Sequence, residues 1–339
     1  MSPTPRRRLL LSAATATLAA SIPRLAWPQA PIALRISSSL PADANSAHFI
    51  WYQRFAANAA KVPGVKIDLQ YFPNSQLGKE ADVVQQVKIG SIDMMLTGSS
   101  IWATVAPELG MLDLGYVFDS YAHVFKSLDG GVGEKLARIV QERTRCTVIG
   151  WGAHFGSRSV YTKQPVHNLA EVKGVKLRVL PTTAFIETFK LIGAIPTPIA
   201  FNELYTALQT HVVEGQENPL AIIQTGRLYE VQKSCSLTSH VWDGYWVLAN
   251  KRLFEMLPED LQEIVRTEID RSALDQRADI AGLSQTLRAD LGAKGLSFID
   301  VDQEAFRAAL GKTDFYASWR AKYGDTAWEL LEQVSGKLG

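Results

Sequence analysis

Three polar side chains lie at the ends of predicted strands and have the chemistry to bind a carboxylate. Arg178 lies in GVKLRVLP (174–181), where apolar and charged residues alternate as in a strand with two different faces. Arg158 begins another predicted strand after WGAHFG, and Asn218 lies at the end of GQENP. A guanidinium offers a planar fork of donors that matches a carboxylate, and no acidic residue close to Arg178 in the sequence could pair with it. The three residues therefore predict a binding site for an organic acid.

Each residue also has a purely structural interpretation. Either arginine could extend from the edge of a sheet into solvent, with its aliphatic stem lying along apolar surface. Asn218 precedes a proline, and this pair often begins a turn. The spacing alone leaves these alternatives open.

Enzyme and cofactor motifs are not found in the sequence. The glycines of LDGGVGEKLA lack the third glycine of a dinucleotide fingerprint, and no Walker loop, G-x-S-x-G elbow or H-E-x-x-H occurs. The six histidines are far apart and show no metal-ligand spacing. We therefore predict no catalytic residues, no cofactor and no metal.

The elements that must position these residues alternate between strands and helices. Strands are predicted at IALRIS, VKIDLQYF (65–72), IDMMLTG, near 146–151, at 158–163 and 175–180, in VVEGQENP and in LSFIDV. Helices are predicted over 47–61, 79–89, 182–192 and about 258–293. Such alternation indicates a parallel sheet covered on both faces, and ligands of such sheets bind beyond the carboxyl ends of the strands. No linker separates the two α/β units, so we expect two lobes joined by crossing strands.

The N-terminus is typical of an export signal. Arg6, Arg7 and Arg8 precede an apolar run of about 14 residues, which is too short to span a membrane. The interpretation is a signal peptide over 1–30, either an ordinary secretory signal or one of the twin-arginine type. The expected location is the periplasm.

Charge and cysteine content narrow the choice of partners. Removing residues 1–30 takes away four arginines and leaves a net charge of about −3, which disfavours nucleic acid as a partner. No later apolar run reaches the length of a membrane span. Cys146 and Cys235 are too few for a disulfide framework; one bridge is permitted, but buried free thiols are the preferred prediction.

The long run VKGVKLRVLPTTAFIETFKLIGAIPTPIAFNELYTALQTHVVEGQENP resembles the substrate-binding subunits of TRAP transporters, the dicarboxylate-type family. The resemblance extends through YFPNSQLGKE, VKIGSIDMML and the C-terminal helices. It implies a two-lobed α/β periplasmic binding protein, with a ligand cleft between lobes joined by hinge strands and a long helix. It also implies residues 31–155 with 243–283 as lobe 1 and 156–242 with 284–339 as lobe 2.

The resemblance assigns roles to individual positions. It implies Arg178 as the carboxylate clamp, Arg158 as a second cation, Asn218 as the residue that completes the site and Phe201 as an aromatic wall. Glu80 and the TGSS segment, represented by Ser99, lie where the first lobe contacts the rest of the ligand; alternatively, Glu80 is a favourable charge in the first turn of its helix. Trp242 either packs in the core or hinge or supplies an apolar wall.

The resulting hypothesis is a periplasmic receptor that captures an organic acid and delivers it to the membrane permease of a TRAP transporter. Aromatic residues near the expected cleft (Trp102, Phe155, Phe201 and Trp242) make a monocarboxylate as plausible as a dicarboxylate, and we favour a hydroxy or keto acid. The alternative is an exported α/β enzyme acting on small organic acids, with Glu80 or His154 as its base.

Overall fold

A computed structural model describes residues 31–64 and 66–338, so the predicted signal peptide lies outside the described residues. Within this part of the chain, nine strands form one continuous sheet in the order β2-β1-β3-β8-β4-β7-β5-β6, and β9 pairs with β8. The strands are β1 (Ile32–Ser37), β2 (Ile67–Phe72), β3 (Met94–Gly98), β4 (Cys146–Thr162), β5 (Lys176–Val179), β6 (Ile195–Pro198), β7 (Gly215–Pro219), β8 (Ser234–Asn250) and β9 (Ser297–Ile299).

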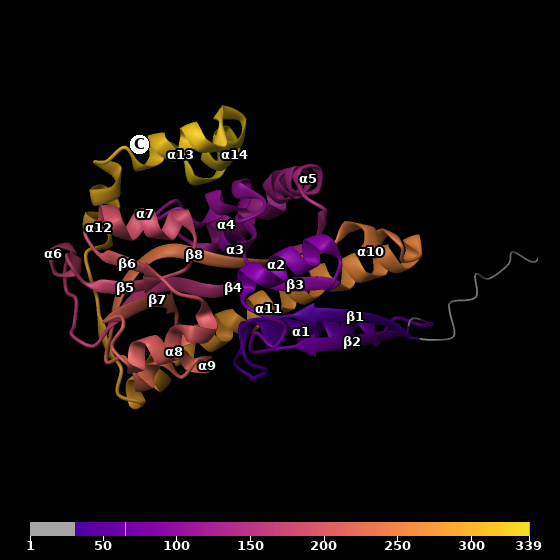
Figure 1. Ribbon diagram of the computed structural model, residues 1–339, viewed down its shortest axis with the longest axis horizontal. Coiled ribbons are helices and arrows are strands. Elements are labelled where there is room, and N and C mark those ends of the chain that lie inside the picture. Colours follow the sequence, from indigo (N-terminus) through magenta and orange to yellow (C-terminus); the bar gives the residue numbers. More distant parts are fainter. Residues whose placement is uncertain (1–30, 65, 339) are drawn as a thin grey trace, which may run out of the picture.

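The sheet is mixed, which corrects the prediction of a parallel sheet. β1 pairs in parallel with β2 and β3, and β5 pairs in parallel with β6 and β7. Between these two groups, β4 and β8 run antiparallel to each other and to their outer neighbours. Figure 1 shows the two long strands passing from one parallel group to the other, so each lobe is parallel and the connection between the lobes is not.

The strands predicted near 146–151 and at 158–163 are a single strand of 17 residues, β4. No strand is predicted for the glycine-rich stretch between them, residues 152–157. In the structure it stays paired with β8, and several register shifts absorb the irregular backbone. Gly156, with φ of 117°, lies at one of these shifts. Bulges of this kind bend a strand without ending it.

Helices cover both parallel groups. The predicted helices over 47–61, 79–89, 182–192 and about 258–293 are confirmed, and their first and last residues agree with the structure within two residues. The α-helices of the first two thirds of the chain are α1 (Ala47–Ala59), α2 (Glu80–Ile89), α3 (Ser99–Trp102), α4 (Tyr121–Ser127), α5 (Gly133–Arg143), α6 (Leu169–Val172), α7 (Thr183–Leu191), α8 (Phe201–Gln209) and α9 (Leu220–Thr225). Short irregular turns are η1 (Pro107–Asp113), η2 (Leu128–Val132) and η3 (Leu228–Glu230). The remaining helices are α10 (Lys251–Glu255), α11 (Glu259–Ala293), α12 (Gln303–Gly311), α13 (Phe315–Tyr323) and α14 (Asp325–Ser335).

The 35-residue helix α11 connects the two groups on one side of the sheet, because it contacts α1 and β4 as well as α9 and β9. On the opposite side, α13 and α14 lie over α7 and α4 in Figure 1, and α14 contacts both α4 and η1. The C-terminal helices therefore touch segments that the sequence assigned to both lobes. No helix of the described residues is long and apolar enough to cross a membrane.

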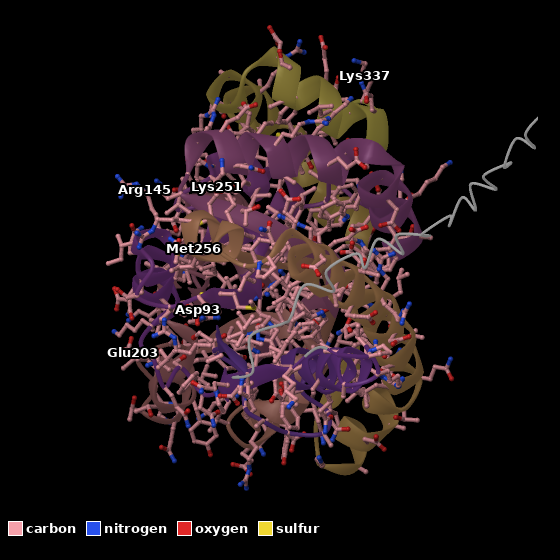
Figure 2. All side chains as sticks on the ribbon, turned by 90° about the vertical axis from the view of Figure 1, so that its right-hand side faces the viewer. Asp93, Arg145, Glu203, Lys251, Met256 and Lys337 are labelled. Carbon is pink, nitrogen blue, oxygen red and sulfur yellow. The ribbon has the colours of Figure 1, made fainter. Side chains whose placement is uncertain are left out.

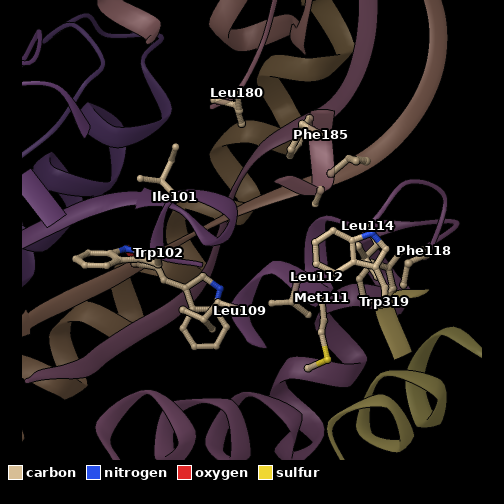
Figure 3. Close-up of a cluster of buried hydrophobic side chains, with 14 of the residues drawn as sticks. Ile101, Trp102, Leu109, Met111, Leu112, Leu114, Phe118, Leu180, Phe185 and Trp319 are labelled. Atoms are coloured by element: carbon tan, nitrogen blue, oxygen red, sulfur yellow. The ribbon is translucent and has the colours of Figure 1, made fainter. Parts of the chain in front are cut away.

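The largest hydrophobic cluster extends from η1 to α7 and α13. Figure 3 shows Trp102 and Leu109 on one side of it and Phe185 and Trp319 on the other. Charged side chains such as Arg145 and Lys337 extend from the surface in Figure 2. Cys146 and Cys235 are buried and unbonded, which confirms the prediction of free thiols.

Candidate ligand-binding site

Arg178 lies on β5, the short central strand of the second parallel group, and it is completely buried. Its Nε donates a hydrogen bond to the carbonyl of Ile199 at 2.8 Å, whereas Nη1 and Nη2 have no partner. Burial lowers the pKa of Arg178 to about 10, and the charge of Arg158 adds to that effect. A buried guanidinium with two nitrogens that make no hydrogen bond lowers the stability of the folded state unless an anion binds to it.

Arg158, on the neighbouring strand β4, is equally buried but is held by an acid. Its Nη2 donates to Oε1 of Glu217 at 2.9 Å and to Oδ1 of Asn218 at 3.0 Å. Burial alone would raise the pKa of Glu217, but Arg158 and His240 outweigh burial and keep that pKa below its usual value. The charge of Arg158 is therefore matched inside the protein.

Asn218 is fixed by its neighbours on both sides of its amide. Oδ1 accepts the hydrogen bond from Arg158, and Nδ2 donates to Oε1 of Gln216 at 2.5 Å. Because Asn218 pairs with Ser159 of β4 in the sheet, its backbone position is set by the β4–β7 ladder. The amide is held in one orientation before any ligand binds.

Glu80 supplies the main acidic group of the first lobe. It is the first residue of α2, and its Oε1 accepts hydrogen bonds from Ser39 at 2.9 Å and Thr97 at 2.7 Å. Ser39 follows β1 and Thr97 lies in β3, so two strand ends and one helix start meet here. This is the edge at which ligands of α/β sheets bind.

A small pocket lies between these groups, with a volume of about 30 Å³, which is room for little more than water. Four of the predicted residues line it together: Glu80, Arg158, Phe201 and Asn218. Glu80 follows β2 of the first parallel group, whereas Asn218 lies in β7 of the second. Other lining residues are Ser39, Leu40, Gly98, Ser100, Ile101, Phe155, Leu180 and Ile222. Arg178 is not among the lining residues, but it lies next to them, because it pairs with Gln216 of β7 in the sheet and Leu180, two residues further along, lines the pocket.

Two predicted residues lie elsewhere. Ser99 donates its hydroxyl hydrogen bond to Asp113 at 2.6 Å and does not line the pocket, whereas the adjacent Ser100 does. Trp242 packs edge-on against Tyr121, with ring centroids 4.6 Å apart, outside the pocket lining. The short helix α3 explains the first difference, because successive residues of a helix face different directions.

Of the other aromatic residues expected near the cleft, Phe155 lines the pocket and Trp102 does not. Trp102 is buried in the core, where its Nε1 donates to the carbonyl of Trp246. Ser39 was missed by the sequence analysis. Its place directly after the first predicted strand is the signal that could have found it.

Comparison with known proteins gives the family. Residues 38–316 match the bacterial extracellular solute-binding protein family 7. The chain belongs to this family.

No group of three or more potential metal-ligating side chains occurs in the described part of the chain.

Several relatives of this family 7 chain are named as solute-binding proteins. The 2,3-diketo-L-gulonate-binding periplasmic protein of Escherichia coli is 33% identical over 73% of this chain and 75% of its own. A TRAP periplasmic solute-binding protein of Xanthobacter autotrophicus, solved with bound β-D-galacturonate, is 26% identical, with a TM-score of 0.84 over 89% of this chain and 99% of its own. The Roseobacter denitrificans protein solved with bound L-galactonate is 27% identical, with a TM-score of 0.81 over 89% and 98% of the two chains.

Proposed function

We propose that this chain is the periplasmic receptor of a TRAP-type transporter and that it captures a hydroxylated acid with a single carboxylate. The observation that carries the proposal is Arg178, which is completely buried and has two guanidinium nitrogens without a partner. Nη1 and Nη2 are the two donors that a carboxylate would engage.

The charge balance of the site favours one carboxylate. Arg158 is matched by Glu217, so Arg178 is the cation whose charge awaits an external partner. Across the pocket Glu80 carries a negative charge, which would repel a second carboxylate and accept hydrogen bonds from hydroxyl groups.

The printed ligands of the three relatives described above support this class, whereas a Rhodobacter capsulatus relative is named for C4-dicarboxylates, which have two carboxylates. Diketogulonate, galacturonate and galactonate each combine one carboxylate with several oxygen-bearing carbons. Phe201 and Phe155 would cover the carbon chain, while Asn218, Ser39 and Glu80 would meet the oxygens.

Binding is coupled to movement of the lobes. The pocket is too small for a sugar acid, so the ligand must enter while the lobes are apart and the lobes must close around it. Since the contacts come from both lobes, the ligand favours the closed state over the open one. Residues 1–30 would direct export of the chain as a signal peptide of either type. In the periplasm, the closed receptor would then bind the membrane permease and deliver the ligand to it.

The structure offers no support for an enzymatic alternative. His154, one candidate base, is buried against Tyr121, with ring centroids 4.0 Å apart, and does not line the pocket. The other candidate, Glu80, lines the pocket, where Ser39 and Thr97 both donate hydrogen bonds to its Oε1.

Native mass spectrometry of the purified protein, followed by calorimetry with a panel of sugar acids, tests the proposal. The Arg178→Ala variant should lose about 2 to 5 kcal/mol of binding free energy, the range for removing one member of a buried charge pair. Arg178→Lys is the matched control, because lysine keeps the positive charge but cannot make the two parallel hydrogen bonds of a guanidinium. Its affinity should lie between that of Arg178→Ala and that of the wild type. Unchanged affinity in Arg178→Ala would refute the clamp, and turnover of the bound acid would favour the enzyme.

A further inference from the structure

A second cavity of about 250 Å³ adjoins the ligand pocket at the seam between the lobes. α3 and η1 form one side, the start of α7 forms another, and α13 covers it. The residues used in the argument below are Ser100, Gly110, Thr182, Thr183, Trp319 and Tyr323. Ser100 lines both cavities, and Leu180 and Pro181 line the first and the second respectively.

Three polar side chains that line this cavity have no hydrogen-bond partner: Ser100 at Oγ, Thr182 at Oγ1 and Trp319 at Nε1. Their residues are only 1%, 8% and 7% exposed. Buried polar atoms in native proteins are almost always satisfied, so a cluster of three around one cavity calls for an occupant. The indole can only donate, so an occupant that contacts it must bring an acceptor, whereas the two hydroxyls can either donate or accept.

The start of α7 adds a second source of positive potential. The helix has nine residues, and the side chain of its N-cap residue, Thr182, makes no capping hydrogen bond. Its first turn, including Thr183 and Ala184, lines the cavity and contains no acidic residue. Free backbone N–H groups at a helix N-terminus attract anions.

Three acidic residues lie near Tyr323; two of them are paired with cations and the third accepts a hydrogen bond. Glu108 forms an ion pair with Arg143, and Glu187 forms one with Lys322 at 2.8 Å. Asp113 accepts a hydrogen bond from Ser99. None of the three carboxylates lines the cavity. The Tyr323 hydroxyl lies close to Gly110, where an added Cβ would be 3.1 Å away, and is a further donor at this wall.

The geometry points to an oxyanion subsite at the N-terminus of α7, formed by Ser100, Thr182, Trp319 and the first-turn N–H groups. The group it takes is a carboxylate or a similar small oxyanion. The anion is a separate small oxyanion, in keeping with a ligand that has one carboxylate; the test below also covers the second carboxylate of an extended acid, which would replace the single-carboxylate ligand proposed above. The subsite itself goes beyond the proposed clamp and stands without it.

The experiment uses three probes: galactonate, which has one carboxylate, galactarate, which has two on a chain of the same length, and sulfate. Thr182→Val and Trp319→Phe each remove one donor. Thr188→Val is the matched control, because Thr188 also lies on α7 with a buried, unpartnered hydroxyl but does not line the cavity. Calorimetry and thermal unfolding are compared at equal ionic strength, with sodium chloride as the reference salt.

If the subsite receives a second carboxylate, Thr182→Val and Trp319→Phe weaken galactarate binding roughly tenfold and leave galactonate binding unchanged. If it receives a separate anion, sulfate stabilises the Arg178→Ala protein saturably, and the same two variants weaken that effect roughly tenfold. The Thr188→Val control changes neither galactarate binding nor the stabilisation by sulfate. The sulfate arm requires no clamp, so it decides the subsite even where the proposed function fails. Equal behaviour of both donor variants and the control in every arm would overturn the inference.

Discussion

Arg158 and Arg178 show that two equally buried arginines can have opposite roles. Both come from central strands, and neither exposes more than 1% of its surface. Arg158 is bound to Glu217, which in turn lies 3.1 Å from His240, whereas the Nη atoms of Arg178 have no partner. Burial therefore identifies both as exceptional, and only the local partners distinguish the paired Arg158 from Arg178, the proposed carboxylate clamp.

Replacing Glu217 by Gln should destabilise the protein strongly. The substitution removes a buried charge that matches Arg158, and breaking a buried pair from one side costs about 3 kcal/mol or more of the free energy of unfolding. Urea denaturation measures the loss. Glu230→Gln, which breaks a solvent-exposed pair with Arg227, is the control and should show no measurable loss. Equal effects of the two substitutions would contradict the role of Glu217.

His154 makes the stability depend on pH. Burial lowers its pKa to about 4, while the unfolded chain titrates near 6.5. Between these pH values, His154 is protonated in the unfolded state but neutral in the folded state. The free energy of unfolding therefore falls as the pH falls from about 6.5 to about 4. The contribution of one such histidine approaches 1.4 kcal/mol per pH unit.

The His154→Phe variant should therefore have a shallower pH dependence in urea unfolding across that range. Phe125→Leu changes a neighbouring ring, 5.4 Å from His154, without changing the number of titrating groups, and should keep the wild-type slope. If the free energy of unfolding of His154→Phe depended on pH as steeply as that of the wild type, this histidine would be excluded as a cause of the pH dependence.

At the scale of elements, β4 and α11 are in close contact. Gly150 of β4 faces Ile269 of α11 so closely that an added Cβ would overlap Cγ2 of the isoleucine. Here a glycine is required by the approach of a helix to a strand, since its φ is not in the left-handed region.

Gly150→Ala should destabilise the protein by about 1 to 3 kcal/mol through overpacking. In an Ile269→Ala background, which itself costs about 2 to 5 kcal/mol, the same substitution should cost less than about 1 kcal/mol, because Cγ2 is gone. A double-mutant cycle by urea denaturation measures this coupling. Gly244→Ala is the control, since its Cβ would lie 3.5 Å from the carbonyl of Ala153, an ordinary contact. Strictly additive costs would show that β4 and α11 do not constrain each other here.

At the scale of the whole molecule, an exposed ion pair joins segments of the two parallel groups. Lys79, just before α2, lies 2.5 Å from Glu203 of α8, and both side chains are about half exposed, at 50% and 49%. Figure 2 shows Glu203 at the periphery of the molecule. This pair connects a segment of the first parallel group to one of the second.

Glu203→Gln should weaken ligand binding less than about fivefold, because an exposed ion pair contributes little and, on the proposed mechanism, opening of the lobes would separate its two partners. The effect should be present at about 0.01 M salt and disappear at about 1 M, where charges are screened. Calorimetry at the two salt concentrations measures it. Glu255→Gln, in a pair within α10, makes the same charge change inside one element and should not alter affinity. A loss of affinity that persists at high salt would show that Glu203 acts other than as a charge.

The sequence by itself determined most elements and the type of site. β1 has the predicted bounds, and the predicted helices at 79–89 and 182–192 end or begin within one residue of those observed. Local periodicity and capping residues fix such elements, because the signals lie within a few residues of one another. The isolated Arg178, with no acid nearby in the sequence, already indicated a ligand with a carboxylate.

Only the tertiary structure decided which side chains meet. The continuity of β4 depends on its pairing with β8, about 90 residues away, so the glycine-rich stretch could not be read as strand from its own sequence. The partner of Arg158 is Glu217, 59 residues away, and the choice between Ser99 and Ser100 depends on how α3 leaves β3. Long-range pairing and the direction of side chains are set by packing of the whole chain, which local patterns do not record.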